Sequence, residues 1–258
     1  MLITTRNFLR LLRAGAFGQE SAVEPMSVWK WQQVFQLSLM HGVGHIAWEG
    51  VERLQQQFFV QQLPDTLCQQ WRQVKAPVRN EPADSKKLQR LLDETGYTTS
   101  AYELLRQQYH VARHFLNDGL FLHDLLLMGR YLRQHADDID YVQLLQWQRQ
   151  LGLGRLAEFE NLLLVELMGF LPDELLPQET ATDRRLLNYV INDLGDLARP
   201  RSTQWTFEQG GDVFVHASNS AAMLWQARRS MHYFRYCPTE SVTNILTSFA
   251  RSLSQIEE

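Results

Sequence analysis

Cysteine is scarce in this sequence, and the patterns of a signal peptide and of a membrane helix are missing. The 258 residues include two cysteines, Cys68 and Cys237, which lie far apart and have no neighbours at metal-ligand spacing. We therefore expect a reduced, cytoplasmic protein with two unreactive thiols. The first residues do not have the pattern of a signal peptide, and no apolar run reaches the roughly 18 residues that a membrane helix needs. The net charge of −4 argues against nucleic acid and anionic membranes as partners.

Strand patterns are almost as scarce, because helical periods dominate the chain. Apolar residues recur every three or four positions, which is typical of helices with one buried face. The first apolar stripe begins at Leu2, and Gly15 and Gly18 are expected to break that helix. We predict an all-α, bundle-like domain of about ten helices. The exception is the segment 205–215, where apolar residues flank a Gly-Gly turn and predict one small β-hairpin.

One segment is typical of a linker. Residues 75–87 contain two prolines and several charges, and a short helix follows them. This pattern divides the chain into an N-terminal helical part over 1–75, a linker with a short helix over 76–99, and a central and C-terminal helical part over 100–258. We expect the two helical parts to pack as one body.

Two histidines have a spacing that occurs in zinc sites. His110 and His114 lie four residues apart in one predicted helix, so their rings share a face. His123 and Asp124 follow closely and would complete a site. The metalloprotease pattern is excluded, because Val111 stands where that pattern has glutamate. The alternative is that these histidines pack under the next helix and form local hydrogen bonds.

Three carboxylates lie together in the run Asp-Asp-Ile-Asp. Asp137, Asp138 and Asp140 are of the residue type that holds magnesium for phosphoryl transfer. At the start of a helix the same residues also satisfy free backbone amides and the helix dipole. We favour the capping role, because the sequence has no glycine-rich phosphate loop after a strand.

A basic face is predicted near the C-terminus. Arg228, His232 and Arg235 recur at helical spacing among aromatic residues. Such a face is suited to phosphate or to an acidic partner. The alternative is a solvated face that pairs with acidic helices of the same chain.

Several segments resemble a bacterial, uncharacterised family of nucleotidyltransferase-like proteins. The central segment 109–132 is similar to one of its helical stretches, and 137–170 is similar to the helix pair that follows. The segments 8–15, 28–51 and 228–242 resemble the family's opening and closing helices. The resemblance covers most of the chain, but the motifs are degenerate helical patterns.

The departures from that family concern its chemistry. Members carry a nucleotidyltransferase core with an Asp-x-Asp pair between the two helical parts, whereas this chain has only the linker and a short helix there. His123, Leu127 and Met128 stand where the family tends to have arginine, aspartate and tryptophan. Of the polar signature, His110, Arg113 and His114 remain. The resemblance therefore implies a helical frame whose catalytic core has been lost.

The leading functional hypothesis is a non-catalytic binding or scaffold protein that uses no cofactor. Its expected partner is another protein or a small anionic ligand, bound by a polar site of His110, Arg113, His114, Arg228, His232 and Arg235. Two alternatives stay open. One is a magnesium-dependent nucleotidyltransferase, active alone or with a second chain, for which Asp138 and Asp140 are the candidate ligands. The other is a structural subunit that forms homo-oligomers.

Overall fold

Helices form all the regular structure that can be described. The computed structural model describes residues 1–77, 86–96, 98–117, 119–176, 184–195 and 197, and these contain eleven α-helices, two short 3₁₀ helices and no strand. The predicted all-α class is therefore confirmed. The predicted hairpin at 205–215 lies outside the described residues.

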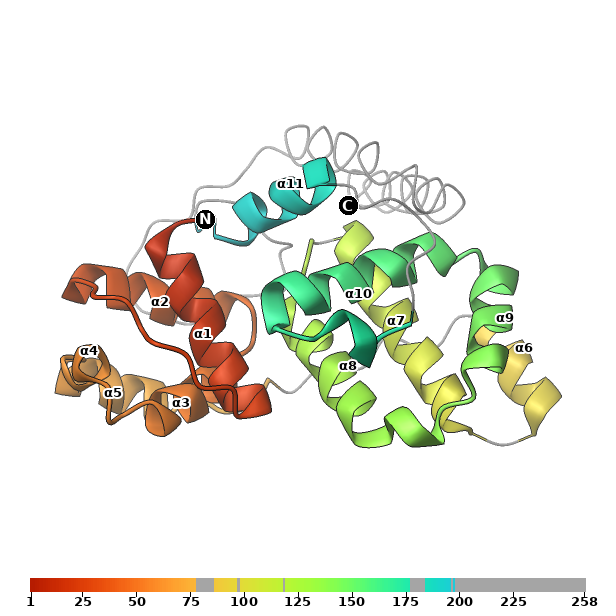
Figure 1. Cartoon of the computed structure of the whole chain (residues 1–258), viewed down its shortest axis with the longest axis horizontal. Coiled ribbons are helices and arrows are strands. Elements are labelled where there is room, and N and C mark those ends of the chain that lie inside the picture. The colour runs from red at the N-terminus through yellow and green to blue at the C-terminus, as the bar shows by residue number, and fades with distance from the viewer. Residues whose placement is uncertain (78–85, 97, 118, 177–183, 196, 198–258) are drawn as a thin grey trace, which may run out of the picture.

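The helices lie in two groups with α11 across them (Figure 1). The first group is α1 (Ile3–Phe17), α2 (Val28–Met40), α3 (Gly44–Arg53), α4 (Phe58–Gln61) and α5 (Asp65–Arg72). The second is α6 (Lys86–Thr95), α7 (Ser100–Asn117), α8 (Leu122–His135), η1 (Ala136–Asp138), α9 (Tyr141–Leu151), α10 (Gly154–Met168) and η2 (Pro172–Glu174). The last described helix is α11 (Arg184–Leu194).

Two glycines let α1 and α3 pack with their backbones in close contact. A Cβ atom at Gly15 would lie 2.0 Å from the carbonyl oxygen of Ile46, and one at Gly50 would lie 2.0 Å from that of Leu11. The prediction of a break is wrong for Gly15, because this glycine lies inside α1 and serves the crossing. It is confirmed for Gly18, where the helix ends with a left-handed φ of 68°. Leu2, predicted to belong to the buried stripe, is 70% exposed.

Contacts between the two groups involve both apolar and polar side chains. One cluster of buried apolar residues includes members from α1 through α11. Arg13 of α1 donates to the carbonyl oxygens of Leu167 and Glu166 at the end of α10, both at 2.8 Å. Phe17 packs edge-on against Phe170 at 5.3 Å between ring centroids. These contacts cap the last turn of α10 and join it to α1.

Two expectations from the sequence concern unreactive cysteines and the lack of a membrane helix. Cys68 is half-buried, and burial is the main cause that raises the pKa of its thiol, which agrees with a cysteine of low reactivity. Cys237 lies outside the described residues.

Within the described part of the chain, no helix is both long and apolar enough to cross a membrane.

Candidate ligand-binding site at the α3, α7 and α8 junction

Three of the predicted polar site residues share one face of α7. Arg113 and His114 follow His110 by three and four residues, and all three side chains are half-buried. The helix that carries them begins at a local cap, because the Thr99 hydroxyl accepts the backbone N–H of Tyr102 at 3.0 Å. The predicted common face is therefore present.

The turn after α7 brings Asp124 against His114. Gly119 takes a left-handed φ of 97° in this turn, a conformation that glycine adopts without a steric penalty. Nδ1 of His114 donates to Oδ2 of Asp124 at 2.5 Å, and Nδ1 of His123 lies 3.5 Å from the other carboxylate oxygen. The three side chains are between 12% and 18% exposed. One carboxylate thus serves two imidazole rings.

A third histidine reaches this cluster from the other group of helices. The ring of His45, in the first turn of α3, lies 6.3 Å from that of His123 between centroids. Its Nδ1 atom is buried and has no hydrogen-bond partner. Burial lowers the pKa of His45, and the charges of His123 and Arg130 lower it further, while Glu49 raises it. The environment of His45 therefore favours the neutral ring.

The chemistry available at this junction is anion recognition and proton exchange. A carboxylate that accepts from Nδ1 fixes the tautomer and the orientation of the imidazole ring. Arg113 adds a permanent positive charge on the same face. Among the described residues, no group of three histidine, cysteine or carboxylate side chains is arranged to hold a metal ion. The sequence placed His123 and Asp124 close to His110 and His114 but did not predict the bond between His114 and Asp124.

The other predicted site residues do not join this cluster. Asp140 is the N-cap of α9, where its carboxylate accepts the backbone N–H of Gln143 at 3.0 Å. Asp138 lies 3.6 Å from the ring of His135, and Asp137 is in the same 3₁₀ turn. The capping role of the acidic run is therefore confirmed for Asp140. Arg228, His232 and Arg235 lie outside the described residues.

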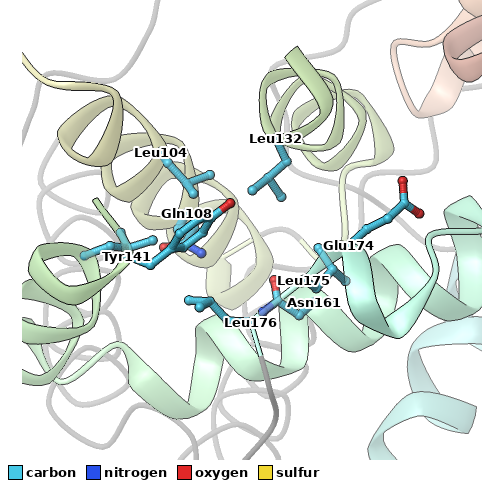
Figure 2. Close-up of a pocket in the computed structure, with 9 residues that line it drawn as sticks. Leu104, Gln108, Leu132, Tyr141, Asn161, Glu174, Leu175 and Leu176 are labelled. Atoms are coloured by element: carbon cyan, nitrogen blue, oxygen red, sulfur yellow. The ribbon is translucent and has the colours of Figure 1, made fainter. Parts of the chain in front are cut away.

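A small cavity lies elsewhere, between α7, α8, α9 and α10 (Figure 2). Gln108, Tyr141 and Asn161 supply its polar atoms, among leucine side chains, and Glu174 points away from the other residues. Its volume is about 10 Å³, enough for about one water molecule. Ligand sites for drug-sized molecules measure roughly 300 Å³ or more, so this cavity does not hold such a ligand.

His45 is not among the predicted site residues. It lies four residues after His41, but glycines intervene and the two histidines belong to different helices. His41 is buried at the end of α2 and donates through Nε2 to the carbonyl of Leu194 at 3.1 Å. His45 meets His123 only through the packing of α3 on α8. No local signal in the sequence predicts that contact.

Comparisons of this chain with known proteins found no similar protein. No family model, no curated protein and no solved structure matches it.

Proposed function

We propose that this protein is a non-catalytic binding protein whose ligand carries an anionic group, phosphate or carboxylate, and docks on the α7 face of His110, Arg113 and His114. The observation that carries the proposal is the hydrogen bond of 2.5 Å between His114 and Asp124. This bond fixes the orientation of the His114 ring beside Arg113. Guanidinium and imidazolium groups form the strong, charge-assisted hydrogen bonds that bind such anions.

Two features support the non-catalytic part of the proposal and its derivation from a nucleotidyltransferase-like frame. Residues 73–85 alone separate α5 from α6, a length too short for a mixed sheet with two metal-binding carboxylates. Asp140, a candidate ligand in the enzyme alternative, has a structural role as the cap of α9. Asp138 lies beside His135.

Thermal unfolding with added anions tests the binding site. The full chain is heated with inorganic phosphate and with nucleoside triphosphates, each with and without magnesium. A ligand present at 100 times its Kd stabilises the folded state by about 2.7 kcal/mol, which raises Tm by several degrees in a chain of this size. The shift is expected to disappear in Arg113→Ala and His114→Gln. It should persist in Arg90→Ala, which removes an exposed arginine from α6.

Two outcomes would overturn the proposal. The first is the absence of a shift with every anion, or a shift that Arg113→Ala and His114→Gln leave unchanged. The second is a shift that requires magnesium and is lost in Asp138→Asn and Asp140→Asn, which would favour the enzyme. Asparagine caps helices about as well as aspartate, so Asp140→Asn removes the charge while it keeps the cap of α9.

A further inference from the structure

A line of titratable side chains crosses the boundary between the two groups of helices. His45 and Glu49 lie four residues apart on α3, and His123 and Arg130 lie seven residues apart on α8, so each pair shares one face of its helix. The rings of His45 and His123 are 6.3 Å apart, and Nη2 of Arg130 lies 3.4 Å from Oε2 of Glu49. We call these four side chains the α3–α8 seam.

Acid adds positive charge to this seam. Its own carboxylate is Glu49, and Asp124 lies next to it, beside His123. Asp124 already accepts from His114 at 2.5 Å and lies 3.5 Å from His123, so one carboxylate faces two rings. Glu49 is paired with Arg130. When His45, His123 and His114 are all protonated, four positive groups, including Arg130, face these two carboxylates.

His45 is poorly placed to accept a proton in the closed structure. Its Nδ1 atom is buried and lacks a hydrogen-bond partner, so a proton added there would have no acceptor. The groups whose charges act on His45 are His123 and Arg130 of α8, which oppose protonation, and Glu49 of its own helix, which favours it. The two opposing groups lie across the seam, so separation of α3 from α8 relieves the repulsion.

We propose that the α3–α8 seam is a pH-sensitive joint, closed while His45 is neutral and loosened when acid gives its ring a positive charge beside His123 and Arg130. The joint connects the helices before the linker to those after it. The α7 face is adjacent to it, because His114 shares Asp124 with His123. The proposal requires no ligand on that face and stands apart from the binding function.

The sign of the pH dependence follows from His45. Its pKa is lower in the folded protein than in the unfolded chain, so the unfolded or opened state binds more protons below its ordinary value of 6.5. The contact is therefore fully stable above about pH 6.5 and weakens as the pH falls below it. Each pH unit within the interval between the two pKa values changes the opening equilibrium up to about tenfold.

Hydrogen exchange on the full chain tests the joint. Amide protection, corrected for the intrinsic effect of pH, is compared between about pH 7.5 and pH 5.5, on either side of the ordinary histidine pKa. We expect protection in α3 and at the start of α8 to fall in acid by about tenfold or less per pH unit, while α9 changes little. His45→Gln and His123→Gln should each reduce this fall. His135→Gln is the control, because this half-buried histidine lies beyond the seam, next to Asp138.

Three results would overturn the proposal. The first is protection in α3 and α8 that does not depend on pH, and the second is an equal loss of protection in every helix. The third is a loss in His45→Gln and His123→Gln as large as in the parent. Far-UV circular dichroism establishes first that each variant keeps the helical content of the parent. Having two substitutions on different helices keeps the test decisive if one of them does not fold.

Discussion

Glu160 gives the sharpest prediction about stability. It lies in the middle of α10, is 2% exposed, and neither of its carboxylate oxygens has a hydrogen-bond partner. Leucines occupy the positions one turn away on either side, Leu156 and Leu164, and both are buried. Burial alone raises the pKa of this carboxyl group well above its usual value of 4.5. The group is therefore protonated in the folded protein at a pH where the unfolded chain has released the proton.

The sign and magnitude follow from this difference in proton binding. Between the unfolded pKa of 4.5 and the raised folded pKa, the folded state binds more protons. Stability therefore falls as the pH rises through that interval, by about 1.4 kcal/mol per pH unit. Glu160→Gln should remove this slope, because the amide does not titrate. Glu160→Leu also removes the unsatisfied polar atoms and should raise the free energy of unfolding by about 1–3 kcal/mol near neutral pH.

Urea unfolding followed by circular dichroism measures both effects between about pH 5 and pH 8, the interval above the unfolded carboxyl pKa. The quantity of interest is the difference between parent and Glu160→Gln, because groups such as His45 contribute equally to both. Glu166→Gln, an exposed substitution in the same helix, is the control. Parallel pH profiles for parent and Glu160→Gln would refute the reasoning, and so would a loss of stability in Glu160→Leu.

Three further predictions concern the frame. Gly50→Ala should cost about 1–3 kcal/mol or more in urea unfolding, because its Cβ would meet the backbone of α1, whereas Gly154→Ala, with nothing within 4 Å, should cost nothing. Asp140→Ala should lower stability by about 1 kcal/mol through the lost cap of α9, and Asp140→Asn should restore it. Arg6 and Arg10 lower the pKa of Glu24 to about 2, so its contribution, complete above a pH of about 4.5, is lost as the pH falls towards 2. Glu24→Gln should therefore show a smaller decrease of Tm in acid.

Each of these predictions has an outcome that would contradict it. Equal stability of Gly50→Ala and Gly154→Ala would mean that α1 and α3 separate at little cost. Equal losses in Asp140→Ala and Asp140→Asn would show that the charge of Asp140 matters more than its capping bond. An acid profile of Glu24→Gln that matches the parent would show that its ion pairs with Arg6 and Arg10 do not stabilise the fold in solution.

The candidate site was predictable only in part. The shared face of His110, Arg113 and His114 follows from helical spacing, and His123 and Asp124 follow in sequence closely enough to be considered with them. The contact of His45 with His123 joins residues 78 positions apart and depends on how α3 packs against α8. Spacing along the chain carries no information about such a contact.

Glu160 and Gly15 also show that local sequence does not predict contacts between helices, here for residues that affect stability. A glutamate within the apolar stretch of α10 gives no sign that it is fully buried. Gly15 reads as a helix breaker, because glycine lowers helix propensity, yet α1 continues through it. Only the neighbouring backbone of α3 explains the glycine, since any side chain there would collide with Ile46.

The sequence by itself determined the all-helical class and some helix ends, such as α9 between Asp140 and Gly152. These features depend on contacts within about four residues and on the left-handed φ that glycine accepts. Only the tertiary structure decided which faces meet: the glycine crossing of α1 and α3, the isolation of Glu160 in the core, and the histidines gathered around Asp124. The physical reason is that these contacts join separate helices, and their energies depend on packing and burial rather than on local propensity.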